Sequence, residues 1–237
     1  MLRRPPRASR DERLPHAPLF TRPPYTPDGR LDPTWNGVMT FASWLLLLIV
    51  WVIGDRLVTR WKEREERLKL LSTVDPLTGL ANRRHFMEAM RRECGRAERT
   101  GRPISLLMFD ADDFKQINDE HGHAVGDEVL IGLAGILLDG VRAQTDLVGR
   151  IGGEEFAVLL PEADLAAAVM VAQRICRAAE AHVFEVGDLR LRVTFSGGAA
   201  SSTNVGPDPT ALLHAADAML YRSKRAGRNR VSFAEAG

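Results

Sequence analysis

The chain has 237 residues, 45% hydrophobic and 27% charged, which is enough for one folded domain with accessory segments. Its formal net charge of only +1 excludes a strongly basic nucleic-acid-coating protein, and no nucleic-acid partner is expected. Its two cysteines, Cys94 and Cys176, fit no metal-binding spacing and are expected to be buried free thiols in a reducing cytosol.

The chain begins with a Pro- and Arg-rich stretch, residues 1–32, which lacks hydrophobic periodicity and is predicted to be disordered. Residues 33–54 carry no charge and are long enough to form a transmembrane helix. The alternatives are a buried helix and a signal peptide, but a signal peptide would start nearer the terminus and carry a small-residue cleavage site.

Lys and Arg are concentrated just after residues 33–54. The positive-inside rule therefore predicts a single-pass protein of the inner (cytoplasmic) membrane with its C-terminal part in the cytoplasm. The Arg-rich extreme N-terminus argues mildly for the opposite orientation.

Residues 55–74 are charged and favour a helix. Leu57, Trp61, Leu68 and Leu71 fall near a spacing of three to four residues, which Arg64 interrupts. This helical stalk is expected to be either a short two-stranded coiled coil or a single solvated helix.

The remainder, residues 75–237, alternates helical and strand patterns and predicts an α/β or α+β fold, a sheet covered by helices. Helices are predicted at 82–100, 127–141, 164–181 and 209–226, and strands at 104–110, 147–151, 156–160, 183–186, 189–196 and 230–233.

Two of these strands are joined through Gly152 and Gly153, which predicts a tight β-hairpin whose turn residues have positive φ. Glycine also leaves the backbone bare, so that a bulky ligand can lie against it. Glu154 and Glu155 follow at once. Carboxylates beside a bare backbone are typical of a magnesium–nucleotide site.

Asp110 ends an apolar strand, where metal ligands are common. An EF-hand loop is excluded because Lys115 and His121 occupy the positions that need Gly and Glu. If the strand of Asp110 and the hairpin of Glu154 are neighbours, the two acids and a backbone carbonyl could hold one or two magnesium ions. The alternative is that these acids are simply solvated in a turn.

The chain has no P-loop motif, so cationic side chains would have to hold any phosphates. Lys224 and Arg228, spaced i,i+4 near the end of the last helix, are candidates, as is Lys115; a solvated basic face is the alternative. Asn118 and Asp127 bracket a helix start. Asp127 could cap that helix, or accept two hydrogen bonds from guanine.

The chain resembles the GGDEF-domain diguanylate cyclases over essentially all of residues 75–237. Four separated motifs carry the resemblance: DPLTGLANRR at 75–84, DADDFKQIND at 110–119 with GH at 122–123 and GD at 126–127, RIGGEEF at 150–156, and DAMLY at 217–221 with GRN at 227–229. The resemblance implies a fold like that of nucleotidyl cyclases and polymerase palms. It also implies an enzyme that condenses two GTP into cyclic di-GMP and two pyrophosphates.

The resemblance also assigns roles to residues of this chain. Magnesium, or manganese, would be held by Asp110, the Ala111 carbonyl and Glu154, with Glu154 helping to deprotonate the 3′-hydroxyl and Glu155 supporting the site. Asn118 and Asp127 would read guanine; Lys224, Arg228 and nearby Lys115 would act on the phosphates; and Gly152 and Gly153 would leave space for the nucleotide. Glu154 stands where the family name has Asp, and either residue supplies a carboxylate.

One departure concerns the family's product-inhibition site, Arg-x-x-Asp, which ends five residues before the first hairpin glycine. Here Asp146 is present, but Ala143 replaces the arginine and Arg142 lies one place off. Alanine cannot imitate the forked contacts of a guanidinium. Product inhibition through this site is therefore expected to be weak or absent.

Each domain would bind one GTP, so the reaction needs a homodimer, which a membrane anchor and paired stalks would favour. The main alternative is a catalytically inactive module that senses GTP or cyclic di-GMP. An ATP-specific cyclase and a structural membrane adaptor are further alternatives. The occupied catalytic positions favour an enzyme over the inactive module and the adaptor, and Asp127 favours guanine over adenine.

Overall fold

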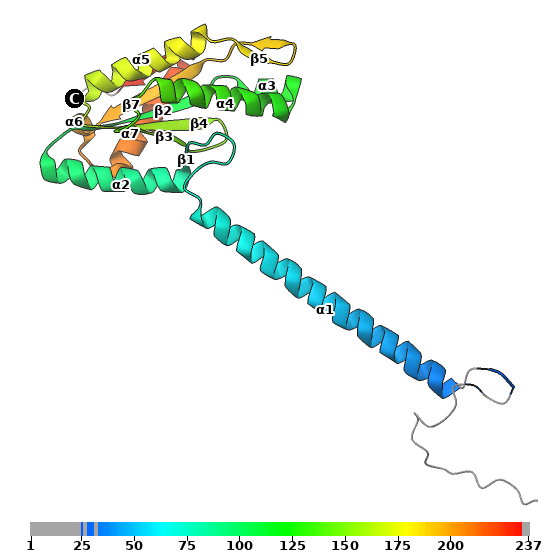
Figure 1. The fold of residues 1–237 in the computed structure, drawn as a ribbon. Helices are drawn as coiled ribbons and strands as arrows, with labels where there is room; N and C mark the ends of the chain where they lie inside the picture. Colours follow the sequence, from blue (N-terminus) through cyan, green and yellow to red (C-terminus); the bar gives the residue numbers. More distant parts are fainter. Residues whose placement is uncertain (1–24, 26–27, 31–32, 234–237) are drawn as a thin grey trace, which may run out of the picture. The chain divides into compact units, whose positions relative to one another are not determined.

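The computed structural model describes residues 25, 28–30 and 33–233, without side-chain detail at 33 and 61–71. The rest of the predicted leader, 1–32, lies outside the described residues. The chain divides into two units, Met1–Leu70 and Leu71–Gly237 (Figure 1).

The first unit is dominated by one helix, α1 (Pro33–Leu71), which continues from the predicted membrane segment into the predicted stalk without a break. Within it, Thr34–Arg60 is long and apolar enough to cross a membrane, with a mean hydropathy of 2.2. Its side chains are exposed, Trp44 by 72% and Phe41 by 71%, unlike those of the core helix of a soluble protein. The side chains of Trp61, Leu68 and Leu71, which bear on the coiled-coil prediction, lie outside the described residues.

The second unit is built on a mixed sheet of six strands in the order β1-β3-β4-β2-β7-β8. Its strands are β1 (Ala81–Asn82), β2 (Ile104–Ala111), β3 (Leu147–Arg150), β4 (Glu155–Pro161), β7 (Phe195–Ser201) and β8 (Val231–Phe233). β2 pairs antiparallel with both β4 and β7, while β7 and β8 are parallel. Strands β5 (Phe184–Val186) and β6 (Leu189–Leu191) form a separate hairpin.

Helices cover both faces of this sheet (Figure 1). They are α2 (Arg83–Thr100), α3 (Phe114–His121), α4 (His123–Asp139), α5 (Leu165–Ala181), α6 (Ser202–Val205) and α7 (Pro209–Arg225). Alternate residues of β2 point to opposite faces: Leu107 and Phe109 pack in the cluster of α4 and α5, whereas Leu106 and Met108 pack in that of α2 and α7. The predicted α+β fold, a central mixed sheet with surrounding helices, is confirmed.

Local signals explain most of the element boundaries. Asn82 and Asp164 each cap a helix, α2 and α5, by accepting a hydrogen bond from a backbone N–H of the first turn. Both predicted free thiols are confirmed as buried, and burial raises the pKa of Cys94 to about 11 and that of Cys176 to about 12. Neither thiol is therefore primed as a nucleophile.

Three boundaries were predicted wrongly. Helix α3 was missed, and α4 starts at His123 rather than at 127, so that Asp127 lies inside the helix and does not cap it. The strand predicted at 189–196 is really two, β6 and the central strand β7. β7 contains Gly197 and Gly198, which are poor strand formers. Any side chain at Gly198 would collide with the backbone of α7, so close packing selects glycine there.

Candidate functional site

The candidate site lies where the end of β2 meets the starts of its two neighbouring strands. In the antiparallel register Asp110 is opposite Glu155 of β4 on one side and Ser196 of β7 on the other. The hairpin that carries Glu154 is fastened to the same place, because the Ala111 N–H donates to the Glu154 carbonyl at 3.2 Å. Sheet pairing thus brings together two acids that are 44 positions apart in sequence (110 and 154).

The two acids share a field of excess negative charge. Burial raises the pKa of the Asp110 carboxyl above its ordinary value; the Lys224 ammonium, 2.7 Å from Oδ2, opposes this, and Glu155 adds to it. Burial also raises the pKa of Glu154, followed by the repulsion of Asp110. The acids are therefore close enough to interact, and one lysine does not neutralise them.

This donor set fits a hard divalent cation. Asp110, Glu154 and the Ala111 carbonyl offer oxygen ligands at a point that already carries surplus negative charge. In the described part of the chain, no three His, Cys, Asp or Glu side chains gather as a complete metal site. Substrate phosphate oxygens and water would therefore have to complete the coordination, as is usual for magnesium–nucleotide sites.

The turn of the hairpin differs from the prediction in its backbone. Neither Gly152 nor Gly153 has positive φ, because the connection runs from Ile151 to Glu154 instead of being a two-residue turn. The Ile151 N–H donates to the Glu155 carbonyl at 2.8 Å and closes this loop. A side chain at Gly152 would collide with the Glu155 carboxylate, while the space beside Gly153 is open. The two positions therefore favour glycine because it has no side chain, and not because they need a positive φ.

Arg150 supports the turn, a contribution that the sequence analysis did not identify. Its guanidinium donates twice to the Gly153 carbonyl, at 2.7 and 3.0 Å, and once to Asp75 Oδ1 at 3.1 Å. Burial alone would raise the pKa of Asp75, but hydrogen bonds from Thr78 and Arg150 bring it below its ordinary value. Arg150 and Asp75 belong to two of the quoted motifs, which was the available signal.

The predicted cations are distributed unevenly around the site. Lys224, in the last turn of α7, reaches Asp110. Arg228 lies beyond the end of α7, in a loop, so it does not share a helix face with Lys224; its Nε is 3.4 Å from Asp113 Oδ1. Lys115 is exposed on α3 and forms no hydrogen bond or ion pair with any described residue. The structure therefore joins Lys224 to the acids and leaves Lys115 apart.

The predicted base-reading residues lie on facing helices. Asn118 is half-buried on α3, and its side chain packs against the backbone of Gly126 on α4. A Cβ at Gly126 would collide with Asn118 Oδ1. Asp127 is the next residue along α4 and is exposed. Gly126 thus permits the close approach of the two helices that brings Asn118 beside the turn carrying Asp127.

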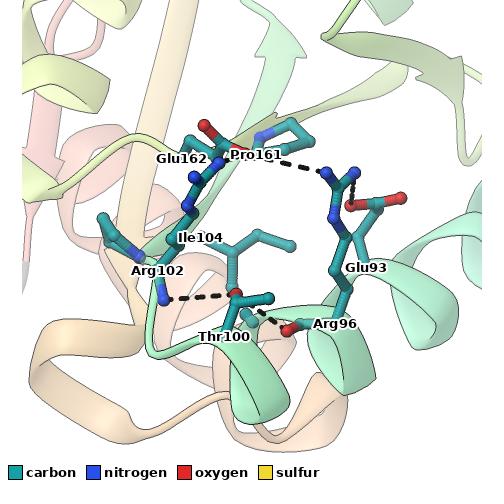
Figure 2. A pocket seen from close by; sticks show the side chains of 9 residues that line it. Glu93, Arg96, Thr100, Arg102, Ile104, Pro161 and Glu162 are labelled. Atoms are coloured by element: carbon teal, nitrogen blue, oxygen red, sulfur yellow. Dashed lines mark hydrogen bonds and ion pairs between the residues drawn. The ribbon is translucent and has the colours of Figure 1, made fainter.

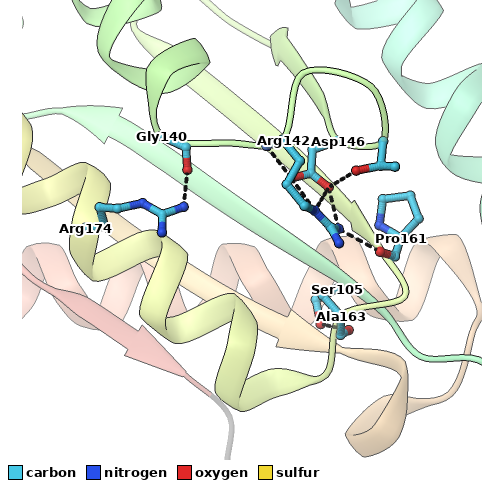
Figure 3. A network of polar contacts seen from close by, with 8 residues as sticks. Ser105, Gly140, Arg142, Asp146, Pro161, Ala163 and Arg174 are labelled. Carbon is cyan, nitrogen blue, oxygen red and sulfur yellow. Dashed lines mark hydrogen bonds and ion pairs between the residues drawn. The ribbon is translucent and has the colours of Figure 1, made fainter.

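At the other end of the β3–β4 hairpin, Asp146 is fully engaged within the chain (Figure 3). Its side chain is 1% exposed, and Arg142 donates to it from the backbone at 2.8 Å and from Nη2 at 2.6 Å. The same guanidinium donates to the Pro161 carbonyl at 2.9 Å. The hydrogen bond to Asp146 raises the pKa of Arg142. The Asp146 carboxylate is therefore already hydrogen-bonded to Arg142 and shielded from solvent.

A hollow near the same end of the sheet lies between the end of α2 and the end of β4 (Figure 2). Its arginines, Arg96 and Arg102, both face Glu162, and they lower the pKa of that exposed carboxyl. Ile104, the first residue of β2, also lines it. The hollow is thus at the opposite end of β2 from Asp110 and belongs to a different surface.

Comparison with known proteins gives a consistent result. The family described as "Diguanylate cyclase, GGDEF domain" matches residues 72–230. Response regulator PleD of Caulobacter vibrioides is 44% identical over 163 residues, which are 68% of this chain and 36% of PleD. The chain spans between 25% and 50% of the length of the curated relatives it matches.

Two solved structures illustrate the similarity. The coiled coil and GGDEF domain of DgcB from Caulobacter crescentus, in complex with c-di-GMP, is 30% identical with a TM-score of 0.65, covering 79% of this chain and 99% of that one. The active GGEEF domain of a diguanylate cyclase from Vibrio cholerae is 32% identical with a TM-score of 0.62, covering 67% and 99%.

Proposed function

This chain belongs to the GGDEF family of diguanylate cyclases, and on that premise we propose that it condenses two GTP into cyclic di-GMP and two pyrophosphates. The observation that carries the proposal is the meeting of Asp110 and Glu154 at one sheet edge beside Lys224. The direct test is stoichiometry: the full chain in detergent, given GTP and Mg²⁺, should release one pyrophosphate per GTP consumed. Release of orthophosphate instead would overturn it.

In the proposed reaction each 3′-hydroxyl attacks the α-phosphorus of the other GTP, forming one P–O bond while the bond to pyrophosphate breaks. Glu154 accepts the hydroxyl proton, and burial together with the neighbouring Asp110 raises its pKa, which makes it a stronger base than an ordinary glutamate. Lys224 and Arg228 balance charge on the phosphates, and Lys115 on α3 is a further candidate for this role. Mg²⁺ or Mn²⁺, held by Asp110, the Ala111 carbonyl and Glu154, would supply charge neutralisation and a lowered hydroxyl pKa when bound.

For base selection we assign Asn118 and Asp127, which lie on the facing helices α3 and α4. A carboxylate accepts from the N1 and N2 donors of guanine, whereas adenine offers an acceptor at N1. GTP should therefore be used in preference to ATP. Gly153 leaves room for the nucleotide beside the turn, since the space next to it is open, whereas the bare backbone of Gly152 accommodates the Glu155 carboxylate.

The reaction needs two domains face to face, so the active form is proposed to be a homodimer. Pairing of residues 55–74 as a coiled coil would raise the effective concentration of the second domain. A Leu68→Pro chain should then lose most of its specific activity in dilute solution, because proline interrupts a helix. Full activity of that chain at the lowest protein concentrations would argue against a paired stalk.

We further propose that residues 33–54 anchor the protein in the inner membrane, with the catalytic domain in the cytoplasm. The support is the exposed, apolar surface of Thr34–Arg60, for which a bilayer would provide burial. Carbonate-resistant membrane association and protease access to the domain only from the cytoplasmic side are the expected results. Release into the soluble fraction would contradict the anchor.

The inactive sensing module is the alternative function. It is disfavoured because the acids and cations that the family's chemistry needs are all present, while the product-inhibition position lacks its arginine. A chain that binds GTP without turnover would favour the module.

A further inference from the structure

One buried carboxylate beside the site has no role in the function proposed above. Asp112, just past the end of β2, is 7% exposed. Its Oδ1 accepts from the Ser196 hydroxyl at 2.6 Å, and its Oδ2 accepts from the Thr194 hydroxyl at 2.7 Å and from the Asn229 N–H at 3.1 Å. Burying a charge is unfavourable unless hydrogen bonds replace water, and here three donors do so.

The third donor belongs to a loop in a strained conformation. Gly227, Arg228 and Asn229 have consecutive positive φ values of 106°, 59° and 44°. For residues other than glycine this conformation is unfavourable by roughly 1–3 kcal/mol and persists only where the surroundings impose it. Such strain at a candidate site calls for a restraint. The bond from the Asn229 N–H to Asp112 acts at the peptide between the two strained residues, Arg228 and Asn229.

Other contacts hold the loop at its two sides. The Arg228 N–H donates to the Ser223 carbonyl at 3.1 Å, and Asn229 Nδ2 donates to Glu180 at 2.9 Å. These bonds reach α7 and α5, whereas the bond to Asp112 reaches the strand that carries Asp110. Asp112 is thus a buried link between the loop and the end of the strand that carries Asp110.

The position of this link matters because Arg228 is the loop's functional candidate. Its Nε lies 3.4 Å from Asp113 Oδ1, at the start of α3, on the same edge as Asp110. We propose that Asp112 is a positioning residue: its carboxylate holds loop 226–230 in the left-handed conformation that directs Arg228 toward the triphosphate. This inference rests on the proposed function, since that function assigns phosphates to Arg228.

The donors also distinguish this role from metal binding. Ser196 lies on β7, Thr194 lies directly before it, and Asn229 lies on the loop, so the carboxylate faces that side of β2 and uses both its oxygens there. Asp110, in contrast, contacts Lys224 and interacts with Glu155. Two aspartates separated by one residue therefore serve different sides of the same strand end.

The test measures binding to the full chain in detergent of two probes, guanosine and the α,β-methylene analogue of GTP, which cannot be cyclised. Asp112→Ala should weaken binding of the analogue about 10- to 100-fold, because displacing a charged group by about an ångström has effects of that size. Guanosine, which lacks phosphates, should bind within about twofold of wild type, since α3 and α4 are untouched. Asp139→Asn, an exposed carboxylate at the end of α4, is the matched control and should change neither.

Two conservative variants sharpen the test. Asp112→Asn should recover most of the analogue binding, because its amide oxygen can still accept from the Asn229 N–H and the Thr194 hydroxyl, while the Ser196 hydroxyl turns to accept from its amide nitrogen. Should Asp112→Ala fail to fold, Thr194→Val and Thr194→Ser supply the same comparison, with Val weakening analogue binding selectively and Ser retaining it.

The outcomes separate this inference from the cyclase itself. A selective loss of analogue binding supports it even if the wild-type chain makes no cyclic di-GMP, a result that would sink the proposed function alone. Equal weakening of both probes, or no change in either, overturns it.

Discussion

The two ends of the β3–β4 hairpin each hold a buried aspartate beside a cation, yet they differ in electrostatic balance. At the turn end, Asp110 has one contact to Lys224, and two further carboxylates lie near it. In addition to burial, Glu155 raises the pKa of Asp110, and Asp110 raises the pKa of Glu154. At the open end, Asp146 takes several hydrogen bonds from Arg142 and is satisfied. An unbalanced cluster is prepared for a cation, whereas a balanced one is structural.

The largest expected effect comes from making the same substitution at both ends. Asp110→Asn should reduce cyclic di-GMP formation by about 10²–10³-fold, because it removes a charge that stabilises the transition state. Asp146→Asn should leave the specific activity of the folded protein unchanged. Product formation and thermal unfolding measured on both chains check this. Equal activity losses would remove the functional contrast between the ends.

Breaking the closed pair, the Arg142–Asp146 ion pair, should lower the stability of the protein and leave its activity unchanged. Arg142→Ala removes the guanidinium donors of the Asp146 carboxylate and keeps the backbone N–H of residue 142, which should lower the free energy of unfolding by about 1–3 kcal/mol. For a domain of this size, that corresponds to a fall in melting temperature of about 2–4 °C per kcal/mol. Calorimetry checks it, with Arg190→Ala, from an exposed ion pair on β6, as the control. An unchanged melting temperature would contradict the closed-pair description.

The pH dependence should reveal the unbalanced end. The pKa values of Asp110 and Glu154 are raised in the folded protein, so both acids favour the folded state below about pH 4, their ordinary range, and this contribution disappears as pH rises through the folded values. Asp110→Asn should therefore gain stability relative to wild type as pH increases from 4 to 7.

Mg²⁺ should oppose that loss. Added Mg²⁺ should stabilise the wild-type chain at pH 7 by about 1.4 kcal/mol for each tenfold excess over its dissociation constant, and progressively less toward pH 4. Melting curves with and without the ion provide the measurement. Equal stabilisation of the Asp110→Asn chain would show that the ion binds elsewhere.

The smallest expected effect concerns the product. Cyclic di-GMP added during turnover should inhibit weakly or not at all. The Asp146 carboxylate is already hydrogen-bonded to Arg142, and Ala143 has no guanidinium that could bind the product. Titration calorimetry with cyclic di-GMP checks this. Tight binding that is lost on Asp146→Ala would contradict it.

How far the sequence predicts the molecule depends on what determines each part. The helices with apolar stripes, such as α2 and α5, and the buried strand β2 follow from periodicity and capping, which are local. The central strand β7 does not, because Gly198 is selected by contact with α7 and Gly197 lies against Phe109 and Val231, contacts that no local pattern indicates. The loop at Ile151–Glu154 likewise depends on how Glu155 packs.

The candidate site divides in the same way. Asp110 and Glu154 could be named from strand-end and hairpin patterns, because both signals are local. The supporting roles of Arg150 and Asp112 depend on partners from distant segments, at Asp75 and Asn229. No spacing rule relates those positions, and only the sheet topology brings them together.

The most direct test of the central claim is the mass of the nucleotide product made from GTP and Mg²⁺ by the full chain and by its Glu154→Gln variant. Glu185→Gln, an exposed glutamate of β5, is the matched control. We predict cyclic di-GMP from the wild-type and Glu185→Gln chains and at least about a hundredfold less from Glu154→Gln. Undiminished cyclic di-GMP from the Glu154→Gln chain, or none from the wild type, would contradict the account.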